Sequence, residues 1–385
     1  MDTAQGFWPA RADDDLVRRL RAFVAETIVP AAHEIDERDL YPTEIVRTLA
    51  ALGCNTICLP TRYGGGGAPH AAAAAVCEEV GYGSAAVAIS LITIFQAQTI
   101  IRLFGSDSLK DRYLPRFAQG MIASYALTEA SHGSDIRTLD TKARRDGESW
   151  ILDGEKSFIT SGSQAEFFVI LAETETGVSA FAVPRESPGL SSYIGHNSAT
   201  FGLRNGPHVN IRLDGVRLPL DHLIGQDGKG VRQAVTTLDY SRTLAAAISI
   251  GIARAAFDAA LAHTRSRVAF DRTVIEFQGI QWYFADMLAR IDAARLLVYR
   301  AAEALDAPDH ADVLRTASAA KLVAAEVATE VASKAVQVCG AYGTMVNAPF
   351  NRFFRDAKTY EIGGGSTEVL RNTLAKYIVK QAAAS

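Results

Sequence analysis

Side chains capable of acid–base chemistry occur at three points where the neighbouring residues leave room for a reaction. His132 stands in the segment YALTEASHGSD, where an imidazole could titrate near neutral pH or simply face solvent in a turn. Tyr240 precedes Ser241 in a helical segment, and Glu361 precedes the glycine run Gly363–Gly365. Glu361 taken alone is expected to be solvated or ion-paired. The glycine run removes side-chain bulk, so it leaves space for a branched substrate, water or oxygen.

Other reactive patterns in the chain are weaker. The four cysteines include Cys54 and Cys58, which lie in an apolar run where a free thiol behaves as a small hydrophobe. We therefore expect neither a disulfide nor a metal site. The run Gly64–Gly67 is not followed by Lys and Ser or Thr, so it predicts a turn rather than a phosphate-binding loop.

Composition narrows the class of protein. Of the 385 residues, 48% are hydrophobic and 21% charged, which is typical of a globular chain. The formal net charge of -4 is spread along the chain, which argues against nucleic acid as a partner. No basic stretch followed by an apolar run marks a secretory signal, and no uninterrupted apolar stretch predicts a membrane span. A cytoplasmic location is expected.

Hydrophobic periodicity divides the chain into three parts. Residues 1–122 show helical spacing, with one apolar stripe in residues 16–28 that Pro30 is expected to interrupt. Residues 123–232 alternate in short segments separated by Gly, Asp and Pro, which predicts an antiparallel β-sheet domain. Residues 233–385 are helical again, beginning with a helix of roughly 35 residues and ending in a bundle. The order of helices, sheet and helices predicts an α+β fold rather than a doubly wound one.

Several local motifs together resemble one family. YALTEASHGSD is similar to the ALTEPxAGSD signature of the acyl-CoA dehydrogenases, and LDGEKSFIT resembles their LNGxKxWIT segment. FGLR with DGVRLP and GQDGKG, RVAF with a later Gln, QVCGAYG and RDAK match further family segments in order and spacing. The resemblance covers nearly the whole chain. It implies the acyl-CoA dehydrogenase fold and FAD as the cofactor.

The resemblance also implies where FAD is held, between the sheet domain and the C-terminal helices. Ser134 would serve the pyrophosphate, Thr128 and Thr160 would hydrogen-bond the isoalloxazine ring, and Phe158 replaces the usual Trp beside it. The other residues matched to FAD contacts within the chain are Tyr125, Leu127, Gly133, Ser366 and Glu368.

A second group of FAD contacts would reach the cofactor of a neighbouring subunit. These residues are Arg267, Phe270, Gln278 and Gln337, with Gly340 and Ala341 in the same motif. An Arg fork pairs well with a diphosphate, although Arg267 could also be a surface charge and Gln278 a helix cap. A shared site implies a homodimer or homotetramer.

Family members remove an α-proton from an acyl thioester with a glutamate while hydride leaves the β-carbon for the flavin. Gap-free alignment from RDAK places Gly364 at the usual glutamate position. A second family position, on the long helix immediately before an Arg, is Ser241 before Arg242. Neither position holds a carboxylate.

Several explanations of this difference stay open. Tyr240, His132 or Glu361 could supply a relocated base. The substrate could instead need no carboxylate, as in a flavin monooxygenase or oxidase of specialised metabolism, or the chain could be a degenerate subunit of a hetero-oligomer. A slip in the alignment is disfavoured because both anchoring motifs are close by.

The favoured interpretation is dehydrogenation of an acyl thioester carried by CoA or an acyl carrier protein, with an electron-transfer flavoprotein as a possible acceptor of electrons. Asp239 and Arg242 match the family's thioester-side D-x-x-R, and the Gly364 N–H could still hold a carbonyl. These are the expected substrate-binding residues.

Overall fold

The apolar stripe near the start of the chain packs into the core, as its spacing predicts. The computed structural model describes residues 14–195 and 198–383, so the N-terminal residues in which we expect no secretory signal lie outside the described part. Helix α1 (Asp14–Phe23) buries Leu20, and a π-helical turn (Val24–Ile28) leads directly into α2 (Val29–Arg38). The expected interruption at Pro30 was wrong, because Pro30 lies in the first turn of α2, where its missing N–H costs little.

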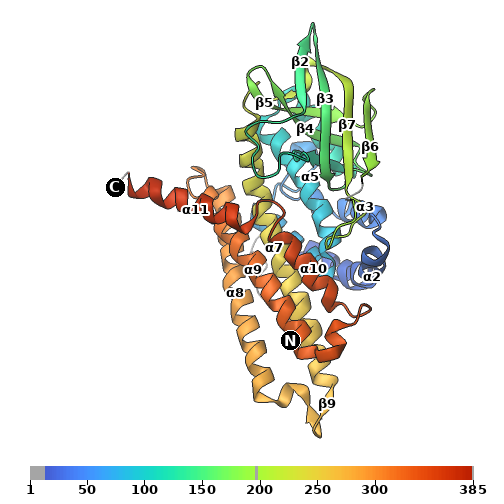
Figure 1. Cartoon of the computed structure of the whole chain (residues 1–385), viewed down its shortest axis with the longest axis vertical. Helices are drawn as coiled ribbons and strands as arrows, with labels where there is room; N and C mark the ends of the chain where they lie inside the picture. Colours follow the sequence, from blue (N-terminus) through green and yellow to red (C-terminus); the bar gives the residue numbers. More distant parts are fainter. Residues whose placement is uncertain (1–13, 196–197, 384–385) are drawn as a thin grey trace.

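The remaining N-terminal helices surround one apolar core. Their bounds are α3 (Thr43–Ala51), α4 (His70–Gly83), α5 (Ala85–Phe104) and α6 (Asp107–Ala118). Ser84 and Ser106 accept hydrogen bonds from backbone N–H groups at the starts of α5 and α6, which fixes where these helices begin. Helix α5 lies between the sheet and the long helix α7, so one of its faces borders the space between the domains (Figure 1).

The middle of the chain forms an eight-stranded sheet with the path β6-β7-β3-β2-β4-β5-β8, and β1 pairs with β4. The strands are β1 (Ala123–Ala126), β2 (Lys142–Asp146), β3 (Ser149–Ile159), β4 (Phe167–Thr174), β5 (Gly177–Pro184), β6 (Leu190–Ile194), β7 (Val209–Pro219) and β8 (Leu223–Ile224). The predicted antiparallel pairing holds for most of the sheet, and β4 additionally pairs in parallel with β1 and β2. The parallel pairing of β1 brings the end of the helical domain against the centre of the sheet.

The C-terminal part is a helical bundle built on α7 (Gly230–Ser266), a single 37-residue helix that confirms the predicted long helix. It continues through β9 (Val268–Ala269), β10 (Arg272–Thr273), α8 (Gln278–Asp306), α9 (Val313–Cys339), α10 (Phe350–Tyr360) and α11 (Thr367–Ala382). Helix α7 runs from the sheet to the far end of the molecule, where β9 and β10 form the tip (Figure 1). The order of helices, sheet and helices is therefore as predicted, while the exact domain limits remain predictions.

Helices α5 and α7 are long and apolar enough to cross a membrane by length and composition alone. In the most apolar stretch of each helix, however, 72% of the residues of α5 and 83% of those of α7 are buried within the protein. Their apolar side chains are thus already covered by the helical core.

The cysteines behave as the small apolar side chains that the sequence predicts. All four are unpaired, and Cys54, Cys77 and Cys339 are buried. Burial raises the pKa of Cys58 to about 12 and that of Cys339 to about 11, so both thiols stay protonated at neutral pH.

Helices α4 and α7 cross at small residues above a buried ionic cluster. A Cβ at Gly251 would lie 2.3 Å from the Glu78 carbonyl oxygen, which leaves no room for a side chain. Nearby, the Glu78 carboxylate accepts hydrogen bonds from Arg254 at 2.8 Å and from Arg295 of α8. The close crossing therefore fixes α7 against α4, and this contact sets the position of every residue that α7 contributes to the site.

Substituting Gly251→Ala should destabilise the protein, because the new methyl group clashes with backbone that cannot move away. We expect a loss of about 1–3 kcal/mol in the free energy of unfolding, measured by chemical denaturation. Gly279→Ala in α8 is the matched control, because a Cβ there meets nothing within 4 Å. Equal stabilities of the two variants would contradict the importance of the α4–α7 crossing.

Candidate functional site

An exposed aromatic side chain marks the face of the sheet domain that the sequence matches to the isoalloxazine ring. Phe158 of β3 is 49% exposed and holds a left-handed backbone conformation with φ of 58°. Large aromatic residues in this conformation are rare and need a structural or functional reason. Nearby in sequence, the Thr160 hydroxyl lies 3.3 Å from the His208 ring nitrogen, and the buried Tyr125 hydroxyl has no hydrogen-bond partner among the described residues. A ligand with a flat ring and polar edges fits this surface.

A buried ion pair stabilises the turn that follows β1 and carries Glu129, His132 and Ser134. Lys156 of β3 is fully buried and lies 2.6 Å from the Glu129 carboxylate. Burial lowers the pKa of Lys156 to about 8. Burial acts to raise the pKa of Glu129, but the hydrogen bonds to its carboxylate and the charge of Lys156 together outweigh it, so the pKa of Glu129 lies below its usual value. The turn itself leaves Gly133 and Ser134 exposed to solvent, so Ser134 is free to contact a phosphate. Thr128 beside it is half-buried, and Leu127 is buried behind it.

His132 lies in this turn and faces an aspartate. Its Nε2 is 3.4 Å from Asp140, and Glu129 completes a group that could hold a cation. Glu129 is already engaged by Lys156 and by the backbone N–H groups of Asp140 and Thr141. The charge of the Glu129 carboxylate is therefore balanced without a metal ion, and His132 contributes to the structure of the turn.

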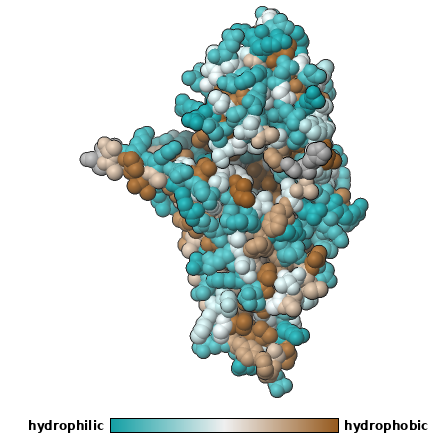
Figure 2. Space-filling view, in the orientation of Figure 1, coloured by the Kyte–Doolittle hydropathy of each residue, from teal (hydrophilic) through white to brown (hydrophobic). Residues whose placement is uncertain are grey.

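The second group of predicted FAD contacts lies at the opposite end of the molecule. Arg267, Gly340 and Ala341 line a cleft of about 610 Å³ at the end of α7 and α9. Phe270 projects beside it with 89% of its surface exposed, while Gln278 and Gln337 are exposed but do not line the cleft. This tip carries a hydrophobic patch that includes Val268 and Phe270 (Figure 2). The sheet domain and this tip lie toward the two ends of the long axis (Figure 1), so the residues of the tip are far from the sheet within one chain.

A glycine loop between α10 and α11 is fixed from two sides. Arg242 of α7 donates from Nε to the Gly364 carbonyl at 3.2 Å and from Nη1 to Asp239 at 2.7 Å. Lys321 of α9 donates to the Gly365 carbonyl at 2.6 Å. Burial, helped by the charge of Arg242, lowers the pKa of Lys321 to about 8, and burial raises the pKa of Asp239 against the opposing charge of Arg242. The two cations thus hold the loop by its carbonyl oxygens.

Gly364 occupies an open position in this loop. Gly364 has a φ of 73°, and a Cβ placed on it would meet nothing within 4 Å. Its N–H donates to no other described residue. Ser366 begins α11 by accepting a hydrogen bond from the Val369 N–H, and Glu368 is exposed in the first turn. The loop therefore offers a rigid backbone donor beside open space.

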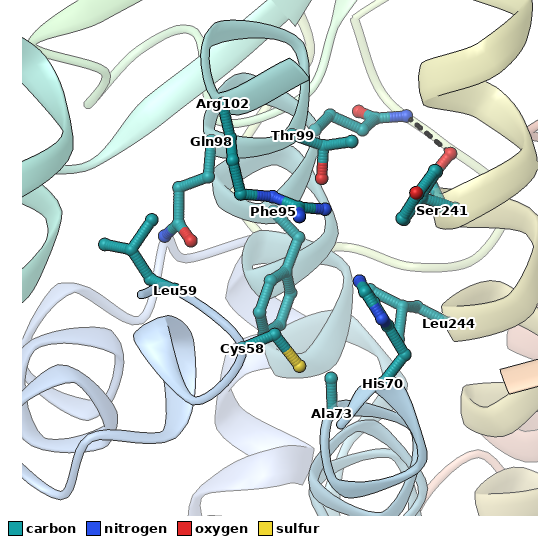
Figure 3. A pocket seen from close by; sticks show the side chains of 12 residues that line it. Cys58, Leu59, His70, Ala73, Phe95, Gln98, Thr99, Arg102, Ser241 and Leu244 are labelled. Carbon is teal, nitrogen blue, oxygen red and sulfur yellow. Dashed lines mark hydrogen bonds between the residues drawn. The ribbon is translucent and has the colours of Figure 1, made fainter. Parts of the chain in front are cut away.

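A small cavity lies behind Ser241, between α4, α5 and α7, and we call it the Ser241 cavity (Figure 3). Its volume is about 20 Å³. Its lining residues are Cys58, Leu59, His70, Ala73, Phe95, Gln96, Gln98, Thr99, Arg102, Tyr240, Ser241 and Leu244. Ser241 accepts a hydrogen bond from the Gln96 side chain at 3.1 Å and donates to the Leu238 carbonyl. None of these lining residues is an Asp or Glu.

The three predicted substitutes for the glutamate lie in different places. Tyr240 is buried and lines the Ser241 cavity, where its ring meets the His70 ring edge-on at 5.0 Å. Glu361 is paired with Lys358 at 2.6 Å, and neither Glu361 nor His132 lines the cavity. Tyr240 is thus the candidate that lies beside Ser241.

Three contributors to the site were missed by sequence reasoning. Lys321 lies in an Ala-rich helix with no motif around it. Gln96 lies in an apolar helix, and only its hydrogen bond to Ser241 in the structure identifies it as part of the site. His70 pairs with Asp306, which is 236 positions away, so no local spacing relates them.

Comparison with known proteins agrees with this architecture. The chain matches the profiles described as acyl-CoA dehydrogenase N-terminal domain over residues 11–121, middle domain over 124–216 and C-terminal domain over 228–379. A probable acyl-CoA dehydrogenase, fadE25 of Mycobacterium leprae, is 35% identical over 373 residues and 95% of each chain.

Two solved structures extend the likeness. Butyryl-CoA dehydrogenase from Megasphaera elsdenii superposes with a TM-score of 0.92 at 30% identity, covering 96% of this chain and 100% of the other. A glutaryl-CoA dehydrogenase from Mycobacterium smegmatis, solved in complex with FADH2, superposes with a TM-score of 0.88 at 26% identity, covering 95% of each chain.

The exposed Phe158 ring, the open turn at Ser134 and the partnerless Tyr125 hydroxyl fit FAD, the cofactor of these flavoproteins. The fold, the three domain matches and the full-length relatives agree with one another. The chain therefore belongs to the acyl-CoA dehydrogenase family of FAD-dependent oxidoreductases, which act on CH–CH groups.

Proposed function

We propose that this protein oxidises an acyl thioester, carried by CoA or by an acyl carrier protein, to the α,β-unsaturated thioester without a carboxylate at either usual base position. The observation that carries the proposal is the Gly364 loop. A Cβ on Gly364 would meet nothing within 4 Å, its N–H has no hydrogen-bond partner among the described residues, and Arg242 and Lys321 hold the carbonyl oxygens of Gly364 and Gly365. A fixed backbone donor of this kind can bind a thioester carbonyl and stabilise the negative charge that develops on it when the α-proton leaves.

The residues that would hold FAD belong to two separate groups. Thr128, Ser134, Phe158 and Thr160 would contact it from the sheet domain, and Arg267, with the cleft at the tip, would contact it from a second copy of the chain. When bound, FAD supplies the acceptor for the hydride from the β-carbon. Phe158 offers an apolar face without the N–H donor of an indole, so the ring is held by stacking and by the threonine hydroxyls.

The substrate's carrier would pass close to Asp239 and Arg242. Arg242 donates a hydrogen bond to one carboxylate oxygen of Asp239, and the second carboxylate oxygen has no hydrogen-bond partner among the described residues. That oxygen can accept an amide N–H of pantetheine, which is common to CoA and acyl carrier proteins. The small residues around Gly364 leave space for a branched acyl group.

We propose a homo-oligomer, because the two groups of predicted FAD contacts lie far apart within one chain. Helix α11 extends away from the bundle (Figure 1) and exposes the apolar side chains Ile378 and Val379, which a second copy could cover. We also propose an electron-transfer flavoprotein as the partner that reoxidises the enzyme, and the cytoplasm as its location.

The activity can be tested by anaerobic mixing of the FAD-loaded protein with a series of acyl-CoAs. We expect loss of the oxidised flavin absorbance and formation of the enoyl-CoA, detected by mass spectrometry. A flavin that no acyl thioester reduces, but that consumes oxygen with an external reductant, would instead show a monooxygenase or oxidase. Failure to bind FAD as a purified homo-oligomer would show a subunit that needs a different partner.

Arg242→Gln should slow flavin reduction, because the Gly364 loop loses a charged hydrogen-bond donor. A bond of this type contributes about 1.5–3 kcal/mol, so we expect a decrease of roughly 10- to 150-fold in stopped-flow reduction, with FAD retained. Arg242→Lys is the matched variant, since it keeps the charge but not the fork that joins Asp239 to the loop. Wild-type reduction rates in both variants would show that the loop does not position the thioester.

A further inference from the structure

We propose that His208 is a positioning residue for the flavin, which holds the Thr160 hydroxyl and reverses the direction of their hydrogen bond when the flavin is reduced. The proposal rests on the proposed contact of Thr160 with the isoalloxazine ring, and it concerns the cofactor rather than the acyl substrate. His208 lies between the matched segments FGLR and DGVRLP, so no motif gives it a role.

The register of the sheet places His208 opposite Thr160. Strands β3 and β7 are antiparallel, and Ile159 at the end of β3 pairs with Val209 at the start of β7. Thr160 follows β3 and His208 precedes β7, so these two residues come next in the same register and their side chains can meet. The Thr160 hydroxyl lies 3.3 Å from His208 Nε2, and His208 is its only hydrogen-bond partner among the described residues.

The backbone of Thr160 is held independently of this contact. The Ser124 hydroxyl of β1 donates to the Thr160 carbonyl at 2.6 Å. Phe158 and Ser161, on either side, both hold left-handed backbone conformations, with φ of 58° and 61°. Such conformations persist only where the surrounding structure holds them, and a β-branched side chain has few rotamers. The fold therefore sets the position of the hydroxyl oxygen, and only the hydroxyl hydrogen turns easily.

The segment that leads to His208 is fixed by the N-terminal helices. The Gly206 N–H donates to the Asp39 carboxylate, which follows α2, at 3.1 Å. The side-chain amide of Asn205 donates to the Ser90 hydroxyl of α5 at 3.1 Å, and both of these side chains are buried. Moving the His208 ring away from the sheet would break these contacts, so the ring stays beside the hydroxyl.

The imidazole of His208 is neutral near pH 7. Burial lowers the pKa of His208 to about 4. A neutral imidazole carries one proton on either nitrogen, so Nε2 can donate to a hydroxyl or accept from it. Reversing the bond to Thr160 moves one proton from Nε2 to Nδ1 and leaves the charge of the ring unchanged. The ring is partly exposed, so water can exchange this proton.

Flavin chemistry makes such a reversal useful. The ring nitrogens of oxidised isoalloxazine accept hydrogen bonds, and reduction turns one of them into an N–H donor. Beside that nitrogen the Thr160 hydroxyl donates before reduction and accepts afterwards. Its own hydrogen then needs a new acceptor, which His208 Nε2 provides. Since an unpaired hydroxyl hydrogen costs more than an unused oxygen lone pair, His208 stabilises the reduced state more than the oxidised one.

The equilibrium constant for reduction of the bound FAD tests this role without any acyl substrate. It is measured by anaerobic reductive titration against a reference dye in wild type, His208→Leu, Thr160→Val and the double variant. We expect His208→Leu to lower the constant about 3- to 10-fold, which is a two-electron midpoint potential about 15–30 mV more negative. In the Thr160→Val background the same change should alter it by less than about twofold, because the hydroxyl is gone. His33→Gln is the control, since His33 is an exposed histidine of α2.

A second readout observes the ring directly in the wild-type protein. The enzyme is labelled with ¹⁵N-histidine, and the ring signals of His208 are assigned by their absence in His208→Gln. We expect Nε2 to be protonated in the oxidised protein and unprotonated after reduction with dithionite, with Nδ1 changing in the opposite sense. A histidine that only supports the fold would keep one tautomer in both states.

The proposal is overturned if His208→Leu, with FAD bound, keeps the equilibrium constant within about 1.5-fold of wild type. It is equally overturned if the effect of His208→Leu is undiminished in the Thr160→Val background, or if the His208 ring keeps the same tautomer in both flavin states. If His208→Leu does not retain FAD, the wild-type spectra decide. Failure of the proposed dehydrogenation looks different, because no acyl thioester would then reduce the wild type, while the titration and the spectra would still report on the His208–Thr160 bond.

Discussion

The contact of Arg242 with the Gly364 loop is the interaction on which the rest of the site depends. Arg242 lies on α7, which is fixed against α4 by the close crossing at Gly251, and its guanidinium joins Asp239 to the Gly364 carbonyl. Because Lys321 holds the neighbouring carbonyl, the loop keeps its shape although its glycines have no side chains to pack. The free N–H of Gly364 and the hydroxyl of Ser241 are therefore presented from two elements that cannot move independently.

At the two positions where we expect the family's glutamate, this chain has Gly364 and Ser241, while the family fold is kept. A glutamate needs room, a partner and a means to remain charged before catalysis. Here Ser241 is bonded to Gln96 and lines a small cavity, whose wall also includes His70, paired with Asp306. We propose that the glycine run at Gly364 leaves room for a bulkier acyl group.

The sequence predicted the order of the three structural parts, the long helix α7 and the family, because helical periodicity and contiguous motifs are local signals. That Gly364 and Ser241 stand at the family's two glutamate positions remains a prediction from the alignment of local motifs. The sequence placed Tyr240 next to Ser241, but it did not predict that Glu361 would pair with Lys358 or His132 with Asp140. The His70–Asp306 pair joins the start of α4 to the end of α8, and the continuous helix through Pro30 depends on a π-helical turn. Contacts of this kind follow from packing and have no signature in the nearby sequence.

The central claim is that one proton leaves the α-carbon and one hydride leaves the β-carbon of an acyl thioester within this site. The most direct measurement is the rate of anaerobic flavin reduction with the preferred acyl-CoA in three forms, which are unlabelled, α-dideuterated and β-dideuterated. The account predicts a primary kinetic isotope effect from each label, because both C–H bonds break during flavin reduction. Reduction without an isotope effect at the α-carbon, or no reduction by any acyl thioester, would contradict it.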